Sequence, residues 1–419
     1  MIACGSSDSD ATGGEPSITC DSGCIDGQVV KGPPGQLDPS FAKAGVATVP
    51  SPRSGSYTYF GAVVRAADGS LFVASYSGEK TGVAHLFSDG SVDRDYGDDG
   101  LAIVPDQPTT ANNRMAFAVD AMNRVIVVQR PKTEDVSSPN GYSLVRLAAD
   151  GSPDASFGTG GVAGPFVEAT QLYPMFAVAR SDGKVMLAGF AGSTDAKFGF
   201  ALHGADGARD PAFSAVKLDA DAPEILSDLV ALGDGSFVTY GAGALRKYDA
   251  NGTPDGAFGT GGVTRLEFPT DAGEPSGVLT SASPNPGLLV GYTIGSGDAV
   301  YVGTAQVAEN GAVGSSTYTR VDPSVSGSPS VSGLAAADDR VALGGFEQTG
   351  VGSGHVWLAE LQPDASFYDA FADGVASDAG FVHSGAYQVH SIIREPGSGK
   401  LLVAGVTTGD QIFVARVFQ

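Results

Sequence analysis

Short apolar runs, separated by polar turns rich in Gly, Asn and Asp, recur along almost the whole chain. One such stretch, Tyr142–Val162 (YSLVRLAADGSPDASFGTGGV), returns at Ala244–Val263 as ALRKYDANGTPDGAFGTGGV. A diverged copy stands at Ala84–Leu101 as AHLFSDGSVDRDYGDDGL. Few stretches show the three-to-four-residue apolar period and the capping residues of a helix. The pattern therefore predicts an all-β protein built from one repeated unit.

Each unit contains two hairpins, and both hairpins occur seven times. The first turns at Gly69, Asn123, Gly183, Gly235, Pro286, Asp339 and Gly399. The second turns at Gly35, Gly90, Gly151, Gly207, Gly252, Gly311 and near Asp364. A period of roughly 50 to 60 residues with four strand-like runs is typical of a propeller blade. We therefore predict a seven-bladed β-propeller of four-stranded blades over residues 34–419.

Most of these turns carry Asp-Gly or Asn-Gly. A two-residue hairpin turn needs positive φ at both of its central residues, and these residue types tolerate positive φ best, so the pattern predicts two-residue turns. The repeat glycines Gly151 and Gly252 are the clearest examples. Phenylalanine stands at one fixed place after the second turn in four copies, as Phe41, Phe157, Phe213 and Phe258. We expect these rings to be buried between neighbouring sheets.

The two ends of the chain hold complementary parts of one unit. The N-terminal copy, Gln36–Val49, begins with the last strand of a unit, and the C-terminal copy, Tyr387–Gln419, stops after the third strand. We expect these pieces to form one blade, which closes the ring and removes an exposed inter-blade surface.

The repeat resembles the unit of the delta-60 repeat family of bacterial β-propellers, which reads roughly LARLNADGSLDTSFGTGG…DGKILVAG. Leu144–Gly161, Ala244–Gly262 and Asp182–Gly189 (DGKVMLAG) carry the resemblance most clearly. The resemblance implies a propeller in an exported bacterial protein. The family has no established catalytic residues, so it implies no site.

Composition and charge narrow the range of partners. Glycine accounts for 60 of 419 residues, which suits many tight turns. Lys+Arg 24 against Asp+Glu 47 gives a net charge of −23, which repels phosphate backbones and anionic lipid. The chain contains no run of about 18 apolar residues, so the sequence predicts no membrane-spanning helix. We expect a monomer that does not bind nucleic acid.

The first residues, Met1–Asp8 (MIACGSSD), resemble the end of a bacterial lipoprotein signal peptide. In that reading Cys4 is the lipidated cysteine, the true start of translation lies upstream, and Gly5–Ser17 is a flexible tether. A chance match of so short a motif is the alternative. We expect residues 1–33 to form the tether, and the protein to be anchored in the bacterial envelope, at the outer membrane or cell surface, or secreted.

The other two cysteines, Cys20 and Cys24, are expected to form a disulfide that closes a small loop, with free thiols or a metal as less favoured alternatives. The five histidines, His85, His203, His355, His383 and His390, show no metal-ligand spacing, and we predict no metal site. Asp249–Asp255 resembles a fragment of a calcium loop, although the same positions form turns in other copies. No nucleophile elbow or phosphate loop is present.

Segments on the face opposite the Asp-Gly turns vary in length and composition. They are Pro105–Arg114, Pro131–Asn140, Pro269–Ser276, Asp322–Ser330, Glu347–Gly354 and Ser377–Ala386. Binding often resides in variable loops on a rigid scaffold, although such loops also drift without function. We therefore predict a non-enzymatic module, without a cofactor, that binds a protein or glycan near these loops and the channel mouth. The alternatives are an extracytoplasmic carbohydrate-active enzyme with acidic residues at the channel mouth, or a calcium-stabilised structural module.

Overall fold

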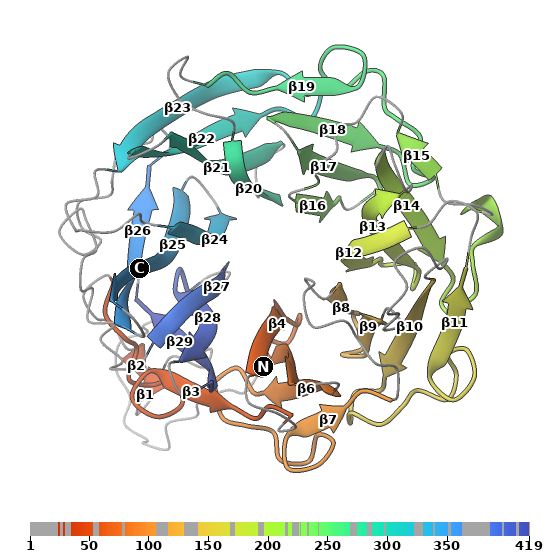
Figure 1. The fold of residues 1–419 in the computed structure, drawn as a ribbon, viewed down its shortest axis with the longest axis vertical. Coiled ribbons are helices and arrows are strands. Elements are labelled where there is room, and N and C mark those ends of the chain that lie inside the picture. The colour runs from red at the N-terminus through yellow and green to blue at the C-terminus, as the bar shows by residue number, and fades with distance from the viewer. Residues whose placement is uncertain are drawn as a thin grey trace, which may run out of the picture.

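The structure is a computed structural model of the 419-residue chain. It describes residues 24–25, 28–29, 35–52, 58–77, 80–105, 116–129, 141–167, 172–191, 197–213, 217–219, 226, 228–232, 234–241, 243–268, 275–282, 287–296, 299–321, 330–337, 340–350, 353–362, 386–395, 398–407 and 410–418. Figure 1 shows small sheets standing around a common centre, each with its first strand innermost. The prediction of an all-β propeller is confirmed.

Three consecutive four-stranded sheets follow the first part of the chain. Blade 1 contains β4 (Thr58–Arg65), β5 (Leu71–Ser77), β6 (Lys80–Leu86) and β7 (Leu101–Ile103). Blade 2 contains β8 (Phe117–Val119), β9 (Val125–Gln129), β10 (Tyr142–Leu147) and β11 (Val162–Phe166). Blade 3 contains β12 (Leu172–Ala179), β13 (Val185–Ala191), β14 (Lys197–His203) and β15 (Lys217–Asp219), with the short 3-10 helix η1 (Pro211–Phe213) before β15.

The remaining sheets complete the circle seen in Figure 1. Blade 4 contains β16 (Asp228–Ala231), β17 (Phe237–Gly241), β18 (Ala244–Tyr248) and β19 (Val263–Arg265). Blade 5 contains β20 (Pro275–Ala282), β21 (Leu288–Ser296), β22 (Ala299–Val307) and β23 (Val313–Val321). A three-stranded sheet contains β24 (Ser330–Ala337), β25 (Arg340–Gly350) and β26 (Ser353–Leu361). A small separate hairpin consists of β1 (Cys24–Ile25) and β2 (Gln28–Val29).

The last four-stranded sheet, the two-ended blade, contains strands from both ends of the chain. Its order is β27 (Ala386–Arg394), β28 (Leu401–Thr407), β29 (Ile412–Val417) and β3 (Val46–Val49). β3 and β29 are antiparallel, with Val49 opposite Ile412 and Val46 opposite Ala415.

The number of complete blades differs from the prediction of seven. Six sheets have four strands, whereas the sheet of β24, β25 and β26 has three strands among the described residues. The sequence repeat that was expected to supply its outer strand lies near Asp364, within residues 363–385, which are outside the described residues. Among the described residues, the ring therefore contains six four-stranded blades and one three-stranded sheet, with the β1–β2 hairpin in addition.

The middle strands of each blade are buried on both faces because each sheet lies between two others. In β5, Leu71 and Val73 belong to the apolar cluster shared with the two-ended blade. Phe72 and Ala74 belong instead to the cluster shared with blade 2. Successive side chains of a strand point to opposite faces, so one continuous apolar run supplies both interfaces. This explains why the repeat reads as unbroken hydrophobic runs.

The hairpin turns contain three residues, and the prediction of two-residue turns is wrong. In blade 1 the Ala66 amide donates to the Ser70 carbonyl at 2.8 Å, and the Gly69 amide donates to the Ala66 carbonyl at 3.0 Å. Gly69 has φ 88°, whereas Asp68 does not have positive φ. The Asp68 carboxylate instead accepts from the amide and hydroxyl of Ser70, at 2.9 and 2.7 Å. Such a loop needs a left-handed backbone at the glycine alone.

Antiparallel strand order places the two hairpin turns of every blade on one side of the ring, which we name the turn face. The connections from second to third strand, and from one blade to the next, lie on the opposite side, which we name the loop face. Neighbouring blades are linked at the turn face by a repeated hydrogen bond. The Gly97 amide of blade 1 donates to the Asp150 carbonyl of blade 2, and the Gly158 amide donates to the Asp206 carbonyl of blade 3, both at 2.8 Å.

Candidate functional site

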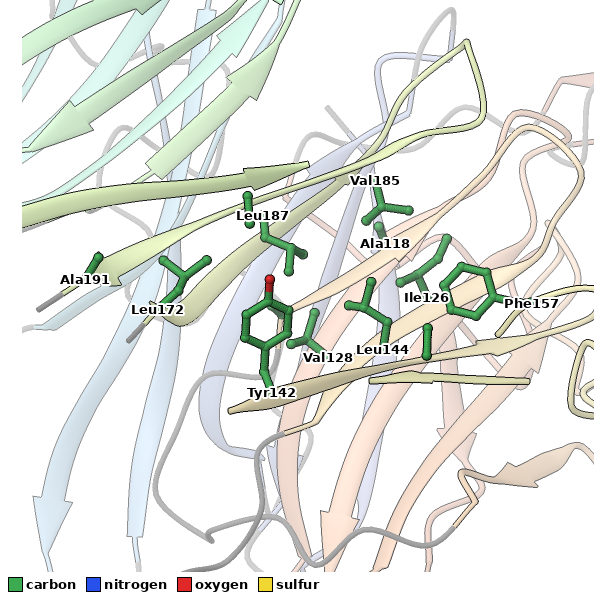
Figure 2. Close-up of a cluster of buried hydrophobic side chains, with 13 residues drawn as sticks. Ala118, Ile126, Val128, Tyr142, Leu144, Phe157, Leu172, Val185, Leu187 and Ala191 are labelled. Carbon is green, nitrogen blue, oxygen red and sulfur yellow. The ribbon is translucent and has the colours of Figure 1, made fainter. Parts of the chain in front are cut away.

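The four repeated phenylalanines lie in the interior. Phe41, Phe157 and Phe213 have 0% exposure, and Phe258 has 1%. Figure 2 shows Phe157 in the apolar layer between blades 2 and 3. A Cβ atom added to Gly207, in the following blade, would lie 2.8 Å from the Phe157 ring. The ring therefore packs directly against a glycine turn of the next blade.

The backbone geometry of both repeat glycines favours glycine, and at Gly151 the available space does so as well. Gly151 has φ 82° and Gly252 has φ 73°, in the left-handed region that favours glycine. A Cβ atom at Gly151 would also lie 2.9 Å from the amide nitrogen of Gly97 in the preceding blade. Tyr96, which replaces the phenylalanine in blade 1, is likewise fully buried.

An aspartate stands three residues before each of these aromatic residues, in a site that we name the Asp socket. In blade 2, Asp154 accepts from Nε of Arg146 at 2.7 Å and from the amide of Ser156 at 2.9 Å. Nη1 of Arg146 also donates to the Ala205 carbonyl of blade 3 at 2.6 Å. Burial acts to raise the pKa of Asp154, but the hydrogen bonds from Ser156 and the charge of Arg146 outweigh it and lower this pKa. The socket thus holds a fixed anion.

The Asp socket of the two-ended blade joins the two ends of the chain. Asp38 Oδ2 accepts from Nζ of Lys400 and Nε of Arg416, both at 2.8 Å. Nη1 of Arg416 donates to the Ser88 carbonyl of blade 1 at 3.2 Å. Burial acts to raise the pKa of Asp38, but hydrogen bonds from Lys400 and Ser40 and the charge of Arg416 lower it. These contacts are structural, because cations and backbone amides occupy the carboxylate.

Two predicted scaffold histidines lie between blades. His85 takes the place of Arg146 in blade 1, and its Nδ1 lies 2.9 Å from Asp93 Oδ2. His203 Nε2 lies 2.9 Å from the Tyr142 hydroxyl, and its Nδ1 lies 3.0 Å from the Gly207 carbonyl oxygen. Burial lowers the pKa of His203 to about 4, so this ring is neutral at pH 7 and accepts from Tyr142.

Of the other three histidines, only His390 has a described side chain. His390 is exposed on β27 and stacks on Phe60, with ring centroids 5.4 Å apart. The side chains of His355 and His383 are outside the described residues. Within the described part of the chain, no group of three His, Cys, Asp or Glu side chains is placed to hold a metal ion.

The calcium-like stretch forms a hairpin turn. Asp249 Oδ1 accepts from the amides of Asn251 and Thr253, both at 2.8 Å. Asp255 Oδ1 accepts from the Ala257 amide at 3.1 Å, and Lys247 Nζ lies 3.6 Å from Asp255 Oδ2. Both carboxylates therefore take part in the turn itself, and calcium binding stays a prediction.

Several predicted features fall where the structure gives no description. Cys4 and Cys20 are outside the described residues, and for Cys24 only its place in β1 is described. Of the variable segments, Pro131–Asn140 is outside the described residues, and most of Pro105–Arg114 is as well. In the remaining segments, the described part consists of backbone at the ends of strands. The described residues include no helix that is long and apolar enough to cross a membrane.

The strands that reach the loop face reveal a polar zone on blade 1. On β5, the row of side chains that faces blade 2 runs through Phe72 and Ala74 to Tyr76. On β6, the corresponding row runs from Val83 to Thr81, which lies directly opposite Tyr76. The apolar rows thus end in a phenol and a hydroxyl at the loop face.

Blade 2 presents matching polar residues to blade 1. On β9, Val125 and Val127 pack in the shared cluster and Gln129 continues their row. On β10, Val145 packs in the same cluster and Ser143, opposite Gln129, continues its row. We name Tyr76, Thr81, Gln129 and Ser143 together the polar end of the blade 1–blade 2 interface.

Two oxygen atoms of the polar end are buried without a hydrogen-bond partner. Thr81 is 2% exposed and Gln129 is 1% exposed. Among the described residues, neither Thr81 Oγ1 nor Gln129 Oε1 has a hydrogen-bond partner. A buried polar atom left unsatisfied costs about 1–3 kcal/mol. The polar end is therefore a costly arrangement for a site that serves only to pack two blades.

An aromatic pair adjoins the polar end on the innermost strand. Tyr59 of β4 lies opposite Tyr76, and their rings stack with centroids 5.0 Å apart and planes 14° from parallel. Tyr59 is 44% exposed, and Tyr76 is partly buried. Burial raises the pKa of the Tyr76 phenol, which keeps it protonated at neutral pH.

The prediction of a binding surface on the loop face did not include these four residues. The endings of LFVASYS (71–77) and VIVVQ (125–129) contain the signal, because polar residues follow apolar runs there. Alternation alone gives two possible faces, and only the register between neighbouring sheets shows that the four side chains share one interface.

Comparisons with known proteins support the fold and assign no activity. Residues 133–157 match a family described as "Domain of unknown function (DUF5122) beta-propeller". No curated protein matches the chain.

Solved structures resemble the chain at low identity. A protein of unknown function from Dyadobacter fermentans is 10% identical, with 90% of this chain and 98% of that chain covered and a TM-score of 0.43. An uncharacterised protein from Listeria monocytogenes is 11% identical, with 87% and 96% covered and a TM-score of 0.41. Prolyl oligopeptidase B from Galerina marginata is 11% identical, with 83% of this chain but 47% of that chain covered and a TM-score of 0.41.

Proposed function

We propose that the protein is a non-enzymatic binding module that holds its ligand at the loop face of a rigid propeller. The observation that carries this proposal is the polar end of the blade 1–blade 2 interface, with its two unsatisfied buried groups beside the exposed Tyr59. Natural proteins tolerate such local cost where it serves a function. The Asp sockets at the turn face, in contrast, have carboxylates already occupied by cations and amides.

In this proposal, seven sheets form a closed ring. The three-stranded sheet of β24, β25 and β26 takes the place of the seventh blade, and the two-ended blade closes the circle. Hydrogen bonds around the chain ends support this arrangement: the Gly35 amide donates to the Phe418 carbonyl at 2.8 Å, as the Gly151 amide donates to the Ala148 carbonyl at 2.9 Å. The interrupted hairpin thus has the same hydrogen bond as an intact one.

The cellular setting belongs to the same proposal. Lipidation at Cys4 would anchor the propeller in a bacterial envelope, with residues 1–33 as tether and a Cys20–Cys24 disulfide within it. The delta-60 resemblance of the repeat favours an exported protein. Metabolic labelling with a clickable fatty acid, on a gene extended upstream, tests the anchor. Labelling that disappears in Cys4→Ser supports it, and an unlabelled product contradicts it.

A thermal-unfolding screen of the full chain tests ligand binding. The panel contains envelope glycans, plant and microbial polysaccharides and divalent ions. A ligand at 100 times its dissociation constant stabilises the folded state by about 2.7 kcal/mol, which gives a visible shift of the midpoint. A saturable shift without product formation supports a binding module. Turnover of a shifted glycan would show that the protein is an enzyme instead.

A further inference from the structure

Two apolar side chains are exposed on the turn face, one on blade 1 and one on blade 2. Phe87 begins the second turn of blade 1 and is 48% exposed, and Met122 lies in the first turn of blade 2 and is 60% exposed. The Phe87 amide donates to the Ser91 carbonyl at 2.8 Å. In the other turn, the Asn123 amide donates to the Asp120 carbonyl at 3.0 Å. Both side chains therefore extend from turns that are closed by backbone hydrogen bonds.

The internal repeat shows that neither turn requires an apolar residue at these places. In blades 2 to 5, the residues that make the hydrogen bond of Phe87 are small or polar: Ala148, Gly204, Asp249 and Ala308. In blades 1, 3 and 4, the residue at the place of Met122 is aspartate: Asp68, Asp182 and Asp234. Phe87 and Met122 are thus departures from the repeat that the turns themselves do not explain.

The Asp68–Gly69 turn of blade 1 lies between these two residues. Its carboxylate accepts from Nδ2 of Asn123 at 2.7 Å, and Asn123 follows Met122. A Cβ atom added to its glycine would lie 3.2 Å from Cβ of Ser88, which follows Phe87. We name Phe87, Met122 and the turn between them the turn-face patch. An exposed apolar patch with a polar rim is typical of a protein–protein contact site.

The turn-face patch and its surroundings carry negative charge. Asp68 accepts from the amide and hydroxyl of Ser70 and from Asn123. Asp89, in the same turn as the exposed phenylalanine, accepts from the amide and hydroxyl of Ser91. Burial acts to raise the pKa of Asp68, but hydrogen bonds from Ser70 and Asn123 outweigh it and lower this pKa. Neutral donors do not cancel the charge of either carboxylate, so this surface attracts cations.

The combination of charge and apolar surface sets the chemistry of a partner. A nucleic acid or an anionic lipid surface would be repelled by a protein with a net charge of −23. In the described part of the chain, no three acidic, histidine or cysteine side chains gather to hold a metal ion. A partner that meets two apolar side chains and two carboxylates must itself carry apolar and basic groups. Methionine suits such a contact because its side chain adapts to irregular apolar surfaces.

We propose that the turn-face patch binds a basic, amphipathic segment of a partner protein. Apolar side chains of that segment pack on Phe87 and Met122, and its Lys or Arg side chains pair with Asp68 and Asp89. The patch lies on the opposite side of the ring from the loop face, so this inference goes beyond the proposed function and does not depend on it.

Phe87→Ala and Met122→Asp are the decisive variants, because each introduces a residue that the repeat carries at that place in other blades. Both should therefore leave the unfolding midpoint unchanged. Val167→Ala is the matched control, since Val167 is 55% exposed and follows the outer strand of blade 2 at the loop face. Asp89→Asn tests the charge alone, because asparagine keeps an oxygen that can accept from Ser91.

Selection from a random peptide display library identifies the partner chemistry directly. The full wild-type chain is the bait, and the Phe87→Ala, Met122→Asp double variant first removes peptides that bind elsewhere. We expect the recovered peptides to be rich in Lys or Arg and to contain apolar side chains. Fluorescence anisotropy should then show binding that is about tenfold or more weaker to the double variant, and weaker to Asp89→Asn and at high salt. Val167→Ala should bind these peptides like the wild type.

Three results would overturn the inference. Recovery of only acidic or uncharged peptides would show that the proposed partner chemistry is wrong. Recovery of no peptide whose binding depends on Phe87 and Met122 would show that the patch binds no such segment. Binding to phosphatidylglycerol vesicles that is lost in the double variant would make an anionic membrane the occupant instead. None of these results bears on ligand binding at the loop face, which the thermal-unfolding screen tests separately.

Discussion

Replacing Asp38 with asparagine should weaken the blade that joins the two chain ends. Asp38 is fully buried and is bonded to two cations, Lys400 and Arg416, each at 2.8 Å. Removing one partner of a buried ion pair costs about 3–5 kcal/mol, because the remaining charge is left without compensation. Glu395 lies 3.8 Å from Arg416 Nη1 and compensates part of that charge, so we expect the lower half of this range.

Asp255→Asn is the matched control, since Asp255 occupies the same place in the Asp socket of blade 4. Its side chain is 36% exposed and its cation, Lys247, is 3.6 Å away. Exposed pairs contribute less than about 1 kcal/mol. Urea unfolding followed by circular dichroism measures both variants, and amide hydrogen exchange reports whether β3 opens first. Equal losses in the two variants, or unchanged exchange in β3 of Asp38→Asn, would refute the reasoning.

The stability lost in Asp38→Asn should depend on pH in a definite direction. The folded pKa of Asp38 is lowered, so its contribution is complete above the unfolded pKa of about 3.9 and is lost as pH falls through the folded pKa. The stability difference between wild type and Asp38→Asn should therefore be constant near neutral pH and shrink below about pH 4. A difference that grows on acidification would contradict the assignment.

Three further predictions follow from the interfaces between blades. His85→Arg should stabilise the fold by about 1–2 kcal/mol in thermal unfolding, because an arginine at this repeat position donates to the next blade, as Arg146 does to the Ala205 carbonyl. The control is Leu202→Arg, at the same repeat position of blade 3. It should destabilise the fold because Leu202 lies in an apolar cluster. Phe157→Ala should lower the free energy of unfolding by about 3–5 kcal/mol. Gly207→Ala should cost less in the Phe157→Ala background than in the wild type, because the ring that its Cβ atom would meet at 2.8 Å is then gone. Fully additive losses in the double variant would contradict this contact. His203 has a folded pKa of about 4 against about 6.5 unfolded, so the wild type should lose about 3 kcal/mol between pH 6.5 and 4, and His203→Leu with Tyr142→Phe should show a shallower decline.

The architecture followed from the sequence because the repeat is local. Apolar runs, turn glycines and the fixed phenylalanines depend on neighbouring residues, and Phe157 and Gly151 lie where the pattern places them. The turn type was missed because Asp68 uses its carboxylate, and not a left-handed backbone, to close the loop. Residue type alone does not distinguish these two uses of aspartate.

The candidate site was only partly predictable because it forms between blades. Thr81 and Gln129 are 48 positions apart in sequence (129 minus 81), and they share an interface only because two sheets stack on each other. Their polarity is visible in the sequence, but whether they point toward each other depends on the register of β6 and β9 within their blades. The variable loops stay a prediction as a binding surface, whereas the polar end consists of residues at strand termini.

The closed ring is tested most directly by a disulfide across the strands that join the chain ends. Ala47 of β3 lies opposite Val414 of β29, so Ala47→Cys with Val414→Cys, in a background with the three native cysteines changed to serine, places two thiols on paired residues. By the chain-entropy estimate, closing so long a loop stabilises a protein by about 6 kcal/mol when the native geometry is undistorted. The account predicts rapid oxidation, altered mobility on a non-reducing gel and a raised unfolding midpoint, with neither single variant showing any of these. Thiols that stay free in the folded double variant would contradict the pairing and, with it, the closed propeller.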